Sequence, residues 1–179
     1  MSYLIPSSEL TVTDIKAYRQ KCEEQAINRA VTIGIATARS EMVVRQPQPL
    51  FDFAATSDGW ISAALNVLEQ DYTVFAGSAS PILANNKLVA FYKVTVETVP
   101  MPVSLLTFRR GPAAGNTLAV FDLQQLVSLQ ETVGYFSEPI VYDKTAQMSI
   151  QVRCRIVTGL GCRVILGGFI VEPVGQIVA

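Results

Sequence analysis

The chain has 179 residues, a formal net charge of -1 and a hydrophobic content of 50%. This length suffices for one domain with a full core, and the near-neutral charge argues against a nucleic-acid binder, which needs a basic face. Charged residues make up 16%, against roughly 25% in ordinary soluble domains. We interpret this shortage of polar surface as a sign that copies of the chain associate.

The apolar content does not predict a membrane protein. A spanning helix needs about 20 consecutive apolar residues, and the most apolar segments here are broken by Arg, Asp, Gln or Gly. Residues 1–10 also lack the basic start and apolar stretch of a signal peptide. We therefore expect neither a membrane nor a nucleic acid as partner.

The first predicted element is an amphipathic helix from about Asp14 to about Arg29. Thr13 is the predicted N-cap, and Asp14 in the first turn suits the helix dipole. The apolar side chains at helical spacing are Ile15, Tyr18, Cys22 and Ala26. We favour packing of this stripe on the chain's own β-domain or oligomer over docking on a different protein.

A proline-containing connector follows a short predicted strand at Glu41–Arg45. Residues 46–49, Gln-Pro-Gln-Pro, favour extended backbone. We place a boundary here, between an N-terminal arm with its helix (1–45) and a β-sandwich domain (46–179). Beyond it, Trp60–Leu68 is compatible with a short helix or a strand, and Trp60 is predicted to be a packing anchor.

Short β segments separated by Gly and Pro turns fill the rest of the chain. The longest is Lys87–Val99, which prolines at 100 and 102 end. Its alternation places Leu88, Ala90, Tyr92, Val94 and Val96 on one face and Val89, Phe91 and Lys93 on the other. The remaining predicted elements are strands at Tyr72–Ala76, Val103–Phe108, Thr117–Phe121, Val133–Phe136, Ile140–Tyr142, Met148–Val157 and Cys162–Val171, and a helical turn at Asp122–Leu129. Together they predict a mainly β, jelly-roll-like antiparallel β-sandwich with an N-terminal amphipathic helix or arm.

The last two strands are expected to pair as a hairpin around the loop Thr158–Gly161. The first alternates apolar and polar side chains, whereas the second is apolar on both faces and needs cover on both sides. In this hairpin Cys154 and Cys162 lie on opposite faces. With Cys22, they are expected to be unpaired buried thiols, because their spacing fits neither a disulfide framework nor a zinc site.

The sequence contains no histidine, which excludes Ser-His-Asp triads, Cys-His dyads and histidine-based metal sites. Its glycine loops lack the dinucleotide-binding and Walker A patterns. Single carboxylates, without a predicted acid pair, are Glu97, Asp122, Glu131, Glu138, Asp143 and Glu172. We therefore expect a protein that is not an enzyme, with no catalytic, cofactor-binding or metal-binding residues and no cofactor.

Arginines offer a different kind of contact. Arg109 and Arg110 are expected in a loop, where a guanidinium could bind a carboxylate of a neighbouring molecule. Arg153 and Arg155 are expected to point outward, where they either join subunits by salt bridges or keep one sheet face hydrated.

Five residue strings resemble the β-domain of tailed-bacteriophage head decoration proteins, also called cement proteins. They are Asn86-Lys-Leu-Val-Ala-Phe-Tyr-Lys-Val, Leu106-Thr-Phe-Arg-Arg-Gly, Val120-Phe-Asp-Leu, Gly134-Tyr-Phe-Ser-Glu-Pro-Ile-Val-Tyr and Gly167-Gly-Phe-Ile-Val-Glu-Pro-Val-Gly. The resemblance covers roughly residues 86–175. It implies a jelly-roll-like homotrimer on the capsid surface of the virion, assembled in the host cytoplasm, that bridges neighbouring major capsid protein subunits. It carries over no functional residues.

Other functions stay open at this point. A helix or arm could engage a neighbouring subunit or the shell, and the chain could instead be a neck or tail component of the virion. A carbohydrate-binding jelly roll would need exposed stacking rings, for which the candidates are Phe51, Phe53, Trp60, Tyr135 and Phe136. A cupin enzyme ranks last, because cupins rely on histidine ligands.

Overall fold

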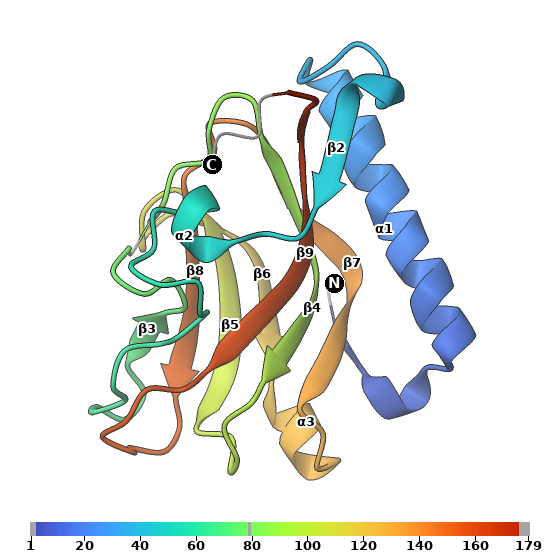
Figure 1. The fold of residues 1–179 in the computed structure, drawn as a ribbon. Coiled ribbons are helices and arrows are strands. Elements are labelled where there is room, and N and C mark those ends of the chain that lie inside the picture. Colours follow the sequence, from blue (N-terminus) through green and yellow to red (C-terminus); the bar gives the residue numbers. More distant parts are fainter. Residues whose placement is uncertain (1–2, 79, 176–179) are drawn as a thin grey trace.

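Two antiparallel sheets face each other in the computed structural model, which describes residues 3–78 and 80–175 (Figure 1). One sheet has the strand order β1-β7-β4-β9-β2, and the other has the order β3-β8-β5-β6. The strands are β1 (Leu4–Pro6), β2 (Met42–Arg45), β3 (Asp71–Thr73), β4 (Leu88–Val96), β5 (Val103–Arg110), β6 (Asn116–Asp122), β7 (Val133–Tyr142), β8 (Met148–Cys154) and β9 (Val164–Pro173).

The strand pairing is that of a jelly roll. β2 pairs with β9, β3 with β8, β4 with β7 and β5 with β6. These nested pairs correspond to one long hairpin whose two arms are wound together across both sheets, and β1 extends the first sheet beside β7. The fold predicted from the sequence, a mainly β jelly-roll-like sandwich with an N-terminal amphipathic helix, is confirmed.

The predicted C-terminal hairpin is wrong, because β8 and β9 belong to different sheets. β8 pairs with β3 and β5, whereas β9 pairs with β4 and β2. The segment between them crosses from one sheet to the other. Cys154 and Cys162 consequently both point into the core between the sheets instead of lying on opposite faces.

The predicted faces of β4 are wrong beyond Tyr92, because the strand has a β-bulge there. The register with both neighbouring strands shifts between Phe91 and Lys93, which changes the phase of the alternation. Leu88, Ala90 and Tyr92 face the helix as one set, as predicted. Val94 and Val96 instead join Val89 and Phe91 in the core between the sheets.

Helix α1 (Val12–Thr32) forms a third layer over the five-stranded sheet (Figure 1). Its buried face consists of Cys22, Ala26, Ile27 and Ala30. The small side chains of Ala26 and Ala30 pack on aliphatic residues of the sheet, and Cys22 packs among aromatic rings. The predicted stripe therefore packs on the chain's own β-domain. The N-cap is Thr11 rather than Thr13, in a capping box with Asp14.

The predicted arm, residues 1–45, is built into the sheet. It supplies β1 at one edge and β2 at the other, and α1 connects them across the outer face. The remaining short helices are the 3-10 turns at Ser7–Glu9 and Arg39–Glu41, α2 (Pro49–Asp52) and α3 (Gln124–Ser128). The helical turn predicted at 122–129 corresponds to α3.

Trp60 anchors one part of the core, as predicted. It is almost fully buried, and its ring packs 5.5 Å from that of Phe53 and 5.4 Å from that of Phe75, measured between centroids. The segment Trp60–Leu68 is neither helix nor strand, and only an isolated bridge joins Ile61 to Arg163. Besides the buried ring, backbone hydrogen bonds at Trp60, Ser62 and Leu65 join this segment to residues 158–164.

Candidate interaction surfaces

Four charged side chains form a buried ion network where the Pro-containing connector returns to the first sheet. Arg45 binds Asp52 with two hydrogen bonds of 2.6 and 2.8 Å and also reaches Glu172 at 2.6 Å. Lys87 lies 2.8 Å from Asp52 and 3.5 Å from Glu172. Both carboxylate side chains are fully buried, and two positive charges balance two negative ones.

The protonation of this network follows from its contacts. Burial raises the pKa of Asp52, but hydrogen bonds from Arg45 and Lys87 outweigh that effect and hold the pKa below its ordinary value. Hydrogen bonding to Asp52 correspondingly raises the pKa of Arg45. Each carboxylate is thus occupied by two cations, so the network ties the connector to the sheet rather than presenting an acid and a base to a substrate.

The predicted single carboxylates have separate partners. Asp143 binds Arg29, Glu97 binds Arg163, and Glu131 accepts hydrogen bonds from Ser7 and Ser8. Sequence reasoning named Glu172 only as a single carboxylate and missed its partners, Arg45 and Lys87. The one sign of a buried ion pair in the sequence was that Glu172 places a charge at the end of the apolar run of β9.

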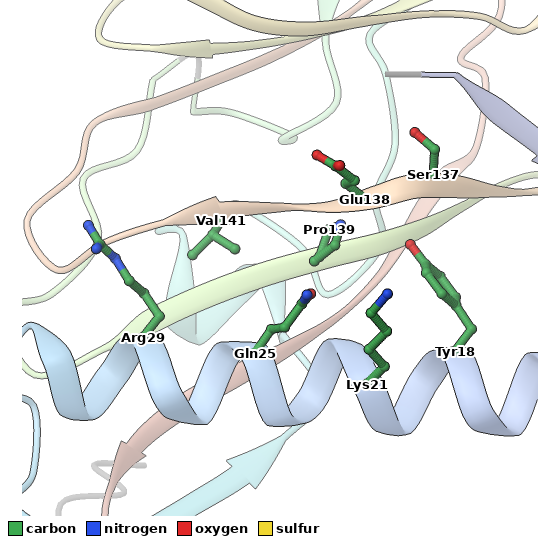
Figure 2. A pocket seen from close by; sticks show the side chains of 8 residues that line it. All are labelled: Tyr18, Lys21, Gln25, Arg29, Ser137, Glu138, Pro139 and Val141. Carbon is green, nitrogen blue, oxygen red and sulfur yellow. The ribbon is translucent and has the colours of Figure 1, made fainter. Parts of the chain in front are cut away.

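A groove of about 460 Å³ separates α1 from β7. Figure 2 shows its walls: Tyr18, Lys21, Gln25 and Arg29 extend from the helix, and Ser137, Glu138, Pro139 and Val141 lie on the strand. The groove is tied at both ends. The Tyr18 hydroxyl donates to the carbonyl of Phe136, and Arg29 binds Asp143 at 2.9 and 2.8 Å.

The middle of the groove carries charges without ion-pair partners. Within the part of the chain that the structure describes, neither Lys21 nor Glu138 forms a salt bridge. Among the described residues, β1 pairs with β7 at residues 134–136, and the backbone N–H of Ser137 donates to the carbonyl of Tyr3. Two charged side chains without ion-pair partners in an open groove are a candidate contact for a segment of another protein.

The end of the sandwich opposite the turn 111–115 carries a group of exposed aliphatic side chains, here called the apolar end. Its segments are held together by backbone hydrogen bonds: Leu65 binds Leu160, and Arg155 binds Pro102. The exposed members are Ile61, Val67, Leu68, Val99, Leu129, Ile156, Val157 and Leu160. Scattered single residues of this kind are ordinary, but a gathering on adjoining segments marks an interaction site.

A cavity of about 370 Å³ opens within the apolar end. Val99, Pro100, Met101 and Val127 provide most of its apolar lining. Val99 is 77% exposed, so the cavity is open to solvent at its rim. The apolar end therefore combines protruding side chains with a hollow.

Most of the aromatic rings that the carbohydrate-binding alternative requires are buried in the structure. Phe53, Trp60, Tyr135 and Phe136 are buried in the two cores, and only Phe51 is exposed. A buried ring cannot stack on a sugar. The aromatic residues chosen from the sequence are thus packing residues.

The predicted arginine contacts are met within the chain. Arg109 lies at the end of β5 rather than in a loop, and it donates to Gln151 and to the Ala113 carbonyl. Arg153 binds Asp71 with two hydrogen bonds of 2.8 and 3.3 Å. These side chains brace the outer face of the second sheet.

The three cysteines are free and buried, as predicted. Burial raises the pKa of Cys22 and of Cys162. Within residues 3–78 and 80–175, no three His, Cys, Asp or Glu side chains gather as metal ligands would. None of the helices described there combines the length and the apolarity of a membrane span.

Comparisons of the chain with protein-family models, with curated proteins and with solved structures find no match. A functional argument must therefore start from the chain's own surfaces, which are the groove and the apolar end.

Proposed function

We propose that this chain is a structural virion protein: a decoration, or cement, protein that forms a homotrimer on a bacteriophage head and bridges neighbouring major capsid subunits. The observation that carries the proposal is the apolar end, a cluster of aliphatic side chains exposed on an otherwise well-packed jelly roll. The residue strings that resemble decoration proteins support it, as does the common use of jelly rolls in viral capsids.

The two surfaces suit two different partners. The apolar end brings copies of the chain together, because burying aliphatic surface is the main favourable contribution to association. The groove, with its free Lys21 and Glu138, takes an extended segment of the major capsid protein beside β7. The apolar stripe of α1 has no part in this, since its own sheet covers it.

Repetition over a capsid lattice makes modest contacts sufficient. A trimer that touches several shell subunits binds at several points at once, so each attachment raises the effective concentration of the next. The shell gains contact area between subunits without any chemical reaction. This mechanism needs surfaces rather than a catalytic centre.

Cosedimentation with heads tests the proposal. Heads of the phage that encodes the chain, purified without it, are mixed with the purified protein and pelleted. We expect the wild-type chain to pellet with the heads and Lys21→Glu to bind roughly tenfold more weakly, because the groove loses its free cation. Lys16→Glu, on the same helix outside the groove, is the matched control and should bind normally.

The outcomes are distinct. A wild-type chain that stays in the supernatant refutes the function as a decoration protein. Equal binding by the two lysine variants rejects the groove as the shell contact. Electron microscopy of decorated heads then locates the chain: binding at many threefold positions supports a shell protein, whereas one ring at a single vertex would identify a neck component instead.

A further inference from the structure

We propose that copies of this chain close into a ring by a contact in which Leu160 of one copy enters the apolar cavity beside Val99 of the next copy. The contact between two copies is argued from the surface of one chain and does not depend on how many copies assemble. That the contacts close into a ring, and that the ring has three copies, rests on the proposed function.

Leu160 is highly exposed, with 72% of its surface accessible. The loop is nevertheless held in place. The backbone N–H groups of Thr158 and Gly159 donate to the Leu65 carbonyl at 3.1 and 3.2 Å, and the Thr158 hydroxyl donates to the Leu160 carbonyl at 2.8 Å. Gly159 has a positive φ of 66°, which glycine adopts without strain. An aliphatic side chain is thus presented to water on an ordered loop.

The cavity has room for such a side chain. Its volume of about 370 Å³ compares with the roughly 150 Å³ of an engineered apolar cavity that holds benzene. Apolar groups from two segments face it, Val99 to Met101 on one side and Val127 of α3 on the other. Glu131 and Gln130 lie at its edge and supply a polar rim.

The protrusion and the cavity occupy different parts of the same end. The loop containing Leu160 lies beside Pro102 and Leu65, whereas the cavity extends toward α3, and Figure 1 shows these segments spread along one end of the sandwich. Within one chain Leu160 does not fill the cavity, since it remains exposed. A contact between unlike patches leaves one patch free on each copy, so such contacts either close into a ring or continue as an open filament. The proposed trimer requires the closed ring, and a mass that rises without limit in solution would show the filament instead.

The exposed area is enough for a weak contact and smaller than that of a standard interface. The exposed fractions of the apolar end amount to roughly 400 Å² of aliphatic surface at about 60–120 Å² for each fully exposed side chain. A standard interface uses about 450 Å² of apolar surface on each partner. Because a ring divides the patch between two neighbours, each contact is small, and the ring should dissociate on dilution.

Two substitutions separate the two sides of the contact. Leu160→Lys removes the protruding side chain, and Val99→Lys places a charge at the mouth of the cavity. Both positions are highly exposed, so neither change disturbs the core. Ile82→Lys is the matched control, because Ile82 is 65% exposed and belongs to a different segment, bridged to Gln147.

Sedimentation equilibrium over a range of concentrations gives the masses. The wild type and Ile82→Lys should reach three times the 19.5 kDa of one chain, while each of the other variants alone remains a monomer. An equimolar mixture of Leu160→Lys and Val99→Lys should form dimers, since the intact Leu160 of one variant fits the intact cavity of the other. An interface of like patches would not recover in this way.

Three results would overturn the inference. They are a wild type that stays monomeric at every concentration, variants that keep the wild-type mass, and a mixture that remains monomeric although circular dichroism shows both variants folded. The cosedimentation assay separates these results from the proposed function. Variants that remain trimers and still bind heads reject the contact alone, whereas a wild-type trimer that ignores heads rejects the function alone.

Discussion

Replacing one carboxylate of the buried network should destabilise the fold by much more than the same change on the surface. In Asp52→Asn, one oxygen is replaced by an amide that donates hydrogen bonds, and it faces donors on Arg45 and Lys87. Glu172 is then left to balance two cations. Removing one member of a buried ion pair costs about 3–5 kcal/mol.

The matched control is Asp71→Asn. Asp71 also binds an arginine, Arg153, through two hydrogen bonds, but its side chain is 25% exposed where that of Asp52 is fully buried. A surface pair of this kind contributes at most about 1 kcal/mol. The two substitutions therefore have the same chemistry and differ in burial.

Differential scanning calorimetry and urea unfolding measure the difference. For a chain of this size each kcal/mol shifts the melting temperature by roughly 2–4 °C, so Asp52→Asn should lower it by about 6–20 °C and Asp71→Asn by no more than about 4 °C. An equal fall in melting temperature in both variants would show that burial does not strengthen the contribution of the network to stability, and would refute the argument from burial.

The pH dependence provides a second check on the same pair of variants. Because the folded-state pKa of Asp52 lies below its ordinary value, its ionised form stabilises the fold above about pH 4, the pKa of an unfolded aspartate, and this contribution is lost as pH falls through the folded pKa. Between about pH 5 and pH 3, the wild type should therefore lose more stability than Asp52→Asn. Parallel pH profiles would contradict the assignment.

Two further predictions concern α1 and the thiols. Thr11→Ala should cost about 1 kcal/mol in urea unfolding because it removes the N-cap, whereas Thr13→Ala should be neutral or slightly stabilising because alanine favours a helix interior; the reverse order would place the cap at Thr13. In a thiol-labelling assay with a disulfide reagent, the native chain should react slowly and the urea-unfolded chain should release three equivalents. Rapid native reaction would contradict the burial of Cys22, Cys154 and Cys162.

The sequence predicted strands well because their signal is local. Alternation and Gly/Pro turns located β4, β5, β6 and β9 to within a few residues, and helical spacing located α1. Their number and spacing were enough to favour a jelly roll. The short β3 was predicted a residue late and too long, and β7 was predicted as two strands.

The pairing of the strands was harder to predict from the sequence. Alternation indicates which face of a strand is buried, but it does not indicate which other strand lies beside that strand. The loop Thr158–Gly161 between two β runs favoured a hairpin, yet β8 pairs with β3, about 80 residues earlier in the chain. The bulge at Tyr92 was also missed. Residues 88–92 are apolar on both faces, so the change of phase shows only after the bulge, where Lys93 and Thr95 fall at positions that continue the alternation of Val89 and Phe91.

The ion network could not be found from the sequence for a related reason. Arg45 and Asp52 are only seven residues apart, but Lys87 and Glu172 are distant from them in the chain, and each residue is an ordinary charge when seen alone. Only the fold brings the end of β9 beside β2 and the start of β4. The apolar end is similar, because it joins four segments whose individual residues look ordinary.

The structure changes the argument for association from the amount of apolar surface to its location. The chain exposes 8787 Å², close to the roughly 8,500 Å² expected for a compact monomer of its mass. Three layers therefore accommodate much of the apolar excess, between the two sheets and again beneath α1. Composition alone had seemed to require other copies to hide this surface. What now favours self-association is that exposed aliphatic side chains gather at one end, with Leu160 held outward beside an open cavity, and this is a feature that a single substitution can test.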